Sequence, residues 1–137
     1  MTIKAKYATP MRQVMDVERS IVFYELLGFE LIDKVGNTRA SWARLHCEGG
    51  SLMLLVVQGQ LYPKVQTSSL VMYTADLIGF REQLRSAGLE VPEIVSPDWM
   101  RSGEIRMFDP DGYSVTICHW GHAEQEAWEK RIGADQK

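Results

Sequence analysis

The sequence predicts an α+β fold in which one βαβββ module occurs twice in tandem. Two segments, residues 16–28 and 76–88, each begin with Asp, end with Gly and carry apolar residues at helical spacing. The two Asp residues are 60 positions apart, and so are the two Gly residues. Each copy also has a tight-turn signal near its end, a Gly-Gly pair ending at Gly50 and an Asp-Pro-Asp-Gly run ending at Gly112. These turn glycines are 62 positions apart, so we expect the copies to stay in step.

Length and composition predict a single domain over residues 1–137. A chain of 137 residues with 45% hydrophobic and 24% charged residues is ordinary for a globular protein. The net charge of −3 argues against a nucleic-acid partner, and no apolar run reaches the roughly 18 residues of a membrane span. The first residues lack the apolar run of a signal peptide. Cys47 and Cys118 lack metal-motif spacing, so we expect free thiols and a cytoplasmic protein.

The first copy covers about residues 5–57. Its helix, residues 16–28, is expected to begin at Asp16, whose carboxylate accepts free amide groups of the first turn. It is expected to end at Gly28, which tolerates the left-handed backbone just past a helix. Four extended segments complete the copy: residues 7–15, 29–35, 41–47 and 51–57.

The second copy covers about residues 68–119 and follows a linker at residues 58–67, which contains Gly59 and Pro63. Its helix is expected at residues 76–88. Its extended segments are residues 69–74, 89–95, 104–108 and 113–119. The tail at residues 121–132 is rich in Ala, Glu and Lys and predicts a C-terminal helix.

Three stretches, residues 14–29, 50–55 and 108–117, make the chain resemble the vicinal oxygen chelate superfamily. This superfamily groups glyoxalase I, bleomycin-resistance proteins and extradiol dioxygenases. The resemblance runs from about residue 7 to residue 118. It implies the glyoxalase/bleomycin-resistance fold, in which a curved mixed sheet surrounds a cup, here followed by a C-terminal helix.

The resemblance also implies where metal-dependent members carry their ligands. The opening-strand position, seven residues before the helix-cap Asp, falls on Thr9 and Ser69. The closing-strand position, four residues after the turn glycine, falls on Leu54 and Thr116. None of these offers imidazole, carboxylate or thiolate. We therefore expect no metal and no cofactor, and the resemblance points to the metal-free branch typified by bleomycin-resistance proteins, which bind a drug without chemistry.

Alternation along the strands predicts which side chains face the cup. On the hairpin strands these are Trp42, Arg44, His46, Leu52, Leu54, Val56, Glu104, Arg106, Phe108, Ser114, Thr116 and Cys118. On the opening strands they are Thr9, Met11, Gln13, Ser69, Val71 and Tyr73. The opposite parity is apolar and is expected to pack under the helices: Ala43, Leu45, Met53, Leu55, Ile105, Met107, Val115 and Ile117.

Arg44 and Arg106 occupy equivalent positions, each six residues before its turn glycine. Two guanidinium groups suit a planar anion, because Arg donates paired hydrogen bonds to carboxylate or phosphate. Flat aromatic surface is expected beside them. The predicted ligand is therefore partly aromatic and either anionic or rich in acceptors. The predicted ligand-binding residues are Trp42, Arg44, His46, Tyr73, Trp99, Glu104, Arg106, Phe108 and Thr116.

Other interpretations stay open. The strands would equally show a polar face to solvent, with Glu104 paired to Arg106 or Arg44. A glyoxalase-type lyase or isomerase would use Glu104 or His46 as base, or an atypical metal site. A third possibility is a non-catalytic interaction module whose cup is filled. The resemblance implies a homodimer, with the cup formed within one chain or by exchange between two.

Several residues have no settled role at this level. Arg12 is predicted on the helix-facing side of its strand, and either reaches the sheet edge or pairs with a Glu across a subunit interface. Trp99 either covers the cup as a lid or packs at a dimer contact. Trp120 and Trp128 are expected to anchor the tail helix, and the histidines of the H-x-x-H at residues 119–122 to lie at the surface.

Overall fold

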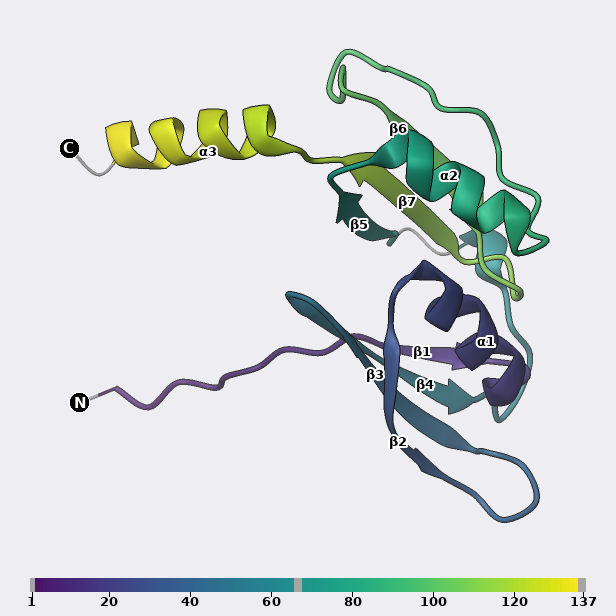
Figure 1. Ribbon diagram of the computed structural model, residues 1–137. Helices are drawn as coiled ribbons and strands as arrows, with labels where there is room; N and C mark the ends of the chain where they lie inside the picture. The colour runs from purple at the N-terminus through teal and green to yellow at the C-terminus, as the bar shows by residue number, and fades with distance from the viewer. Residues whose placement is uncertain (1, 66–67, 136–137) are drawn as a thin grey trace. The chain divides into compact units, whose positions relative to one another are not determined.

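The computed structural model describes residues 2–65 and 68–135 (Figure 1). The chain divides into two compact units, Met1–Val65 and Gln66–Lys137, and each is described by itself. The division falls inside the predicted linker, residues 58–67. The expectation of a single domain stays a prediction.

The first unit is a four-stranded mixed sheet with one helix. Its strands follow the order β1-β4-β3-β2, in which β1 runs parallel to β4 and the other pairs are antiparallel. A short 3₁₀ turn, η1, closes the unit. The elements are β1 (Met11–Val14), α1 (Val17–Leu27), β2 (Glu30–Val35), β3 (Trp42–Cys47), β4 (Gly50–Val56) and η1 (Pro63–Val65).

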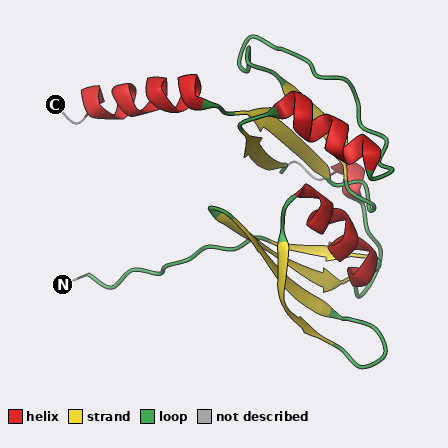
Figure 2. Cartoon of the chain, in the orientation of Figure 1, coloured by secondary structure: helices red, strands yellow, loops and turns green. Residues whose placement is uncertain are grey.

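The second unit is a three-stranded mixed sheet with two helices, coloured by element type in Figure 2. The strand order is β5-β7-β6, with β5 parallel to β7 and β6 antiparallel to it. The elements are β5 (Leu70–Thr74), α2 (Leu77–Ser86), β6 (Glu104–Phe108), β7 (Ser114–His119) and α3 (His122–Asp135). The predicted α+β fold class and its C-terminal helix are confirmed.

Both repeat helices begin as the Asp residues predict. The Asp16 carboxylate accepts the amide of Arg19 at 3.2 Å, and the Asp76 carboxylate accepts that of Gly79 at 2.9 Å. Gly28 follows α1 with φ +115°, a conformation that side chains with a Cβ rarely adopt. The buried side of α1 carries Val17, Ile21, Phe23, Tyr24 and Leu27.

The predicted faces of β4 are wrong. Across the β3–β4 pair, Leu54 lies opposite Ala43 and Leu52 opposite Leu45. Ala43, Leu45, Leu52 and Leu54 are all 0% exposed, so they form the core beneath α1. Val56 shares this face, because it pairs with buried Val14 of β1. Met53 and Leu55, expected in the core, instead lie on the open face, the side of the sheet away from the helix.

The error comes from the choice of turn glycine. Gly49, not Gly50, has positive φ (+80°), as Gly112 does (+92°). The β3–β4 strands are joined by residues 48–49, whereas the β6–β7 strands are joined by the longer loop 109–113. Four residues after Gly49 comes Met53, which lies opposite Arg44 as Thr116 lies opposite Arg106. Gly49 is therefore the structural counterpart of Gly112.

Residues 89–95 do not form the expected strand. Within the described part of the second unit, this segment joins the sheet only through a bridge between Val95 and Glu104. Pro92 has no amide to donate to a strand ladder. Arg81 of α2 instead binds the carbonyl oxygens of Pro92 at 2.8 Å and Val91 at 3.2 Å. A helix side chain thus satisfies backbone groups that a strand partner would otherwise bind.

Candidate functional site

The open face of the second unit holds an acid, an arginine and a thiol in contact. Glu104 is only 4% exposed, and its Oε1 accepts a hydrogen bond from Arg106 Nε at 2.8 Å and forms an ion pair with Arg106 Nη2 at 2.7 Å. Cys118, opposite Glu104 on β7, donates its thiol to Glu104 Oε2 at 3.9 Å. Burial, and then the charge and hydrogen bond of Glu104, raise the pKa of the Cys118 thiol. Both carboxylate oxygens of Glu104 are therefore engaged.

Arg106 also lies over an exposed aromatic ring. Its Cζ is 5.6 Å from the centroid of the Trp99 ring, and Trp99 is 74% exposed. The Trp99 loop is closed by a hydrogen bond from the Met100 amide to the Pro97 carbonyl and returns to β6 at Gly103, whose φ is +108°. Trp99 thus contacts the candidate arginine within its own unit, while its expected role as a lid or dimer contact stays a prediction.

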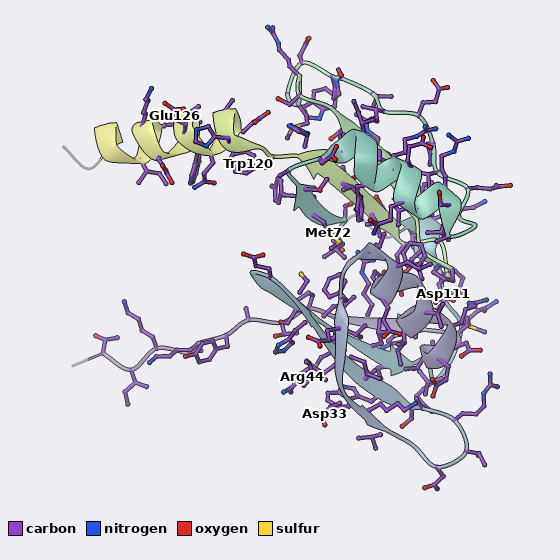
Figure 3. All side chains as sticks on the ribbon, viewed as in Figure 1. Asp33, Arg44, Met72, Asp111, Trp120 and Glu126 are labelled. Atoms are coloured by element: carbon purple, nitrogen blue, oxygen red, sulfur yellow. The ribbon has the colours of Figure 1, made fainter. Side chains whose placement is uncertain are left out.

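The open face of the first unit carries a matching arginine. Arg44 Cζ lies 5.5 Å from the centroid of the Trp42 ring, and its side chain is exposed. Asp33 is its cross-strand neighbour on β2, as Figure 3 labels them, but among the described residues no ion pair joins Arg44 to a carboxylate. Trp42 precedes Arg44 by two residues, and at the equivalent position of the second unit Glu104 precedes Arg106 by two residues. The charge of Arg106 is therefore neutralised by a buried partner, and that of Arg44 is not.

The other predicted site residues are more dispersed. His46 is exposed near the end of β3, opposite Ser51. Phe108 is exposed at the end of β6, opposite Ser114, and Thr116 lies opposite Arg106. Glu104, Arg106, Trp99 and Thr116 come together in the second unit, and Trp42 with Arg44 in the first.

The positions that carry metal ligands in relatives hold hydroxyl groups in both opening segments. Thr9 Oγ1 lies 2.7 Å from Ser51 Oγ, and Ser69 Oγ lies 2.9 Å from Ser114 Oγ. With Gly49 as anchor, the first closing-strand position becomes Met53 instead of Leu54. These neutral donors do not fit a divalent metal. Over the described residues, no group of three or more His, Cys, Asp or Glu side chains is arranged to hold a metal.

Sequence reasoning missed an aromatic groove in the second unit. It has a volume of about 460 Å³ and is lined by Tyr73 of β5, Trp120, Gln125 and Trp128 of α3. The Tyr73 and Trp120 ring centroids are 5.7 Å apart, and those of Trp120 and Trp128 are 6.4 Å apart. Trp120, labelled in Figure 3, lies between β7 and α3. Its Nε1 donates to Gln125 Oε1 at 2.8 Å, which ties the end of β7 to α3. The sequence feature that could have indicated this groove is the pair of tryptophans, which are eight residues apart and lie on either side of the start of the tail helix.

The residues without a settled role have partners in their own chain. Arg12 lies on the helix-facing side of β1, and its Nη1 donates to the hydroxyl of buried Tyr24 at 3.0 Å. His119 Nε2 lies 3.6 Å from Glu124, and His122 Nε2 lies 3.6 Å from a different carboxylate, Glu126.

Several hydrogen bonds hold the Glu124 carboxylate near the start of α3. A hydrogen bond from Ser102 is the main cause that lowers its pKa, followed by backbone amides and by His119. One of these amides is that of Gly121, which donates to Glu124 Oε2 at 3.0 Å. The two histidines of the H-x-x-H therefore serve separate contacts and form no common site.

Comparison with protein families identifies the chain. Residues 6–117 match the family model described as Glyoxalase/Bleomycin resistance protein/Dioxygenase superfamily. Since the match covers most of the chain, the protein belongs to this superfamily, as the three sequence stretches predicted. No curated protein matches the chain.

Solved structures share the fold at low sequence identity. A bleomycin-binding protein complexed with bleomycin is 22% identical with a TM-score of 0.67, covering 85% of this chain and 99% of its own. TnmS3, an antibiotic-binding protein from Streptomyces sp. CB03234, is 20% identical with a TM-score of 0.64, covering 87% and 98%. A lactoylglutathione lyase from Agrobacterium tumefaciens is 14% identical with a TM-score of 0.65, covering 86% and 96%. Binding proteins and an enzyme therefore share this fold.

In the part of the chain that the structure describes, no helix is long and apolar enough to cross a membrane.

Proposed function

We propose that this protein binds a small, partly aromatic molecule that is anionic or rich in acceptors, without a catalytic metal. The observation that carries the proposal is an arginine stacked on a tryptophan on the open face of each unit. These stacks are Arg44 over Trp42 and Arg106 over Trp99.

Such a stack prepares an arginine for a planar ligand. The contact with the indole limits the conformations of the arginine side chain, so less side-chain entropy is lost when a carboxylate or phosphate binds its donors. The same ring offers flat apolar surface beside the charge. Both guanidinium groups keep exposed donors, since the Arg106 side chain is 54% exposed and Arg44 is exposed.

The alternative of a lyase finds less support in the candidate bases. Glu104 would have to abstract a proton, but both of its oxygens are occupied, one by Arg106 and one by the Cys118 thiol. It is better suited to positioning Arg106. His46 is exposed at a strand end, without a carboxylate ion pair among the described residues to orient it.

The named activities of two structural relatives support binding rather than chemistry. One is called a bleomycin-binding protein and the other an antibiotic-binding protein. We extend only the general property to this chain, which is capture of a small molecule. We also propose a cytoplasmic homodimer, on the grounds of the free thiols at Cys47 and Cys118 and of the family resemblance.

A pair of matched probes tests the proposal. Naphthalene-2-carboxylate and its neutral amide have nearly the same shape, so a difference in affinity reports the charge. We expect the carboxylate to raise the melting temperature saturably, and the amide to do so less. Arg44→Ala should weaken carboxylate binding at least about tenfold, because a charge-assisted hydrogen bond contributes about 1.5–3 kcal/mol.

Arg85→Ala is the matched control, since Arg85 is an exposed arginine on α2 whose partner is Glu82. It should leave the affinity unchanged. Equal binding of the two probes, or equal losses in both variants, would contradict the role of Arg44. Turnover of a bound substrate would instead favour the lyase.

A further inference from the structure

A second site lies in the aromatic groove of the second unit. The structure assigns the groove lined by Tyr73, Trp120, Gln125 and Trp128 to a small organic cation of the quaternary ammonium class. This site is separate from the arginine–tryptophan stacks and does not depend on the function proposed for them.

The orientation of the three rings favours a compact cation over a flat ligand. Tyr73 is inclined at 71° to Trp120, and Trp120 is inclined at 72° to Trp128. Rings set at steep angles present their faces in different directions, as in the aromatic cages that bind quaternary ammonium groups. The faces of aromatic rings carry negative charge density, so a cation enclosed by them is stabilised.

The polar groups of the groove favour the same charge. The Trp120 indole N–H is already donated to Gln125 Oε1, and Gln125 Nε2 donates to Glu129 at 3.1 Å. The Tyr73 hydroxyl, the Trp128 indole N–H and the second Nε2 hydrogen of Gln125 have no hydrogen bond among the described residues, and all three are neutral groups. Among the described residues, none of those that line this groove is basic, although Arg131 lines the adjoining hollow beside Trp120 and Trp128. The charge in that hydrogen-bond chain is the Glu129 carboxylate.

The rings are also accessible from solvent. Tyr73 is 60% exposed and Trp128 is 45% exposed, which leaves room for a ligand against both. Trp120 is less exposed, because it holds the start of α3 through Gln125. The groove volume of about 460 Å³ lies within the range of small-molecule sites.

Choline and 3,3-dimethylbutan-1-ol provide the test, because they have nearly the same shape and differ in the positive charge. Binding to the full chain is followed by the indole N–H signals of Trp120 and Trp128 in a ¹H–¹⁵N correlation spectrum. We expect saturable shifts, with choline binding about twofold to fivefold tighter than the alcohol, since an exposed cation–π contact contributes about 0.5–1 kcal/mol. Equal affinity, preference for the alcohol or no saturable shift overturns the proposal.

Variants locate the site. Trp128→Leu should weaken choline binding about threefold or more, and Trp128→Phe should restore part of the loss. Tyr62→Leu is the matched control, because Tyr62 is an exposed aromatic residue of the first unit. Circular dichroism confirms that each variant is folded. If Trp128→Leu is folded and binds choline as the wild type does, the groove is not the site.

The two proposals fail separately. Loss of naphthalene-2-carboxylate binding in Arg44→Ala, with choline binding intact, leaves the cation site standing. Loss of choline binding in Trp128→Leu, with carboxylate binding intact, leaves the anion site standing.

Discussion

At the scale of single residues, one difference between the two copies determines the charge environment of the equivalent arginines. Arg44 and Arg106 occupy equivalent positions in the two copies. The residue two positions earlier is Trp42 in the first unit and Glu104 in the second. Arg44 consequently lies over an indole and retains its charge, while Arg106 lies over Trp99 and is neutralised by a buried acid. An anion is therefore attracted more strongly to Arg44 than to Arg106, so Arg44→Ala is the more sensitive test of anion binding.

The buried acid also controls its neighbouring thiol. Because Glu104 is among the causes that raise the Cys118 pKa, Glu104→Gln should lower that pKa. The measurement is the thiolate absorbance at 240 nm against pH, in a Cys47→Ser background. Glu90→Gln is an exposed control. An unchanged Cys118 pKa in Glu104→Gln would show that burial alone shifts it.

The raised pKa of Cys118 determines the direction in which the stability of the protein changes with pH. A thiol whose pKa is raised by folding stabilises the native state below its unfolded pKa, and this stability is lost as the pH rises through the folded pKa. The Cys118 contribution therefore disappears on the alkaline side, above the ordinary value of 9.0 for a thiol.

At the scale of elements, the starts of the helices could be predicted from the sequence, but the buried face of β4 could not. Asp16 and Asp76 fix helix starts through local hydrogen bonds that sequence displays directly. In β4, by contrast, residues 52–56 are all apolar. Apolar and polar residues therefore do not alternate, and the sequence does not indicate which side chains face the helix. The face then depends on the turn, and two adjacent glycines left the turn ambiguous.

The site was predictable only where it is local. Arg44 with Trp42, and Arg106 with Glu104, are neighbours two apart on a strand, a distance at which side chains share a face. The aromatic groove instead joins Tyr73 to Trp120 and Trp128, from segments that lie far apart in sequence. Residues 89–95 were mispredicted because Arg81, on a neighbouring helix, takes the place of a strand partner.

The turn assignment is testable by substitution. Gly49→Ala should destabilise the protein by about 1 kcal/mol, because an added Cβ is unfavourable at φ +80° although nothing blocks it in space. Gly50→Ala should change stability by less than about 0.5 kcal/mol, since its Cβ would meet only Cys47 Sγ at 3.5 Å. Urea unfolding measures both. A larger loss at Gly50 than at Gly49 would contradict the assignment.

At the scale of the whole molecule, membership of the superfamily rests on residues 6–117, which include both repeats. The homodimer proposed from the resemblance is tested by light scattering coupled to size exclusion. We expect a mass near twice the 15.6 kDa of one chain across a tenfold dilution. A mass of one chain at all concentrations would contradict the homodimer and leave both binding proposals unaffected.

The left-handed glycine of each hairpin fixes which side chains face which way along the strand that follows. Gly49 has φ +80° and Gly112 has φ +92°, a backbone region that residues with a Cβ rarely adopt. Four residues after each glycine, Met53 and Thr116 lie opposite Arg44 and Arg106. A shift of either turn by one residue would therefore move every side chain of that strand to the other face of its sheet, including the one opposite the arginine.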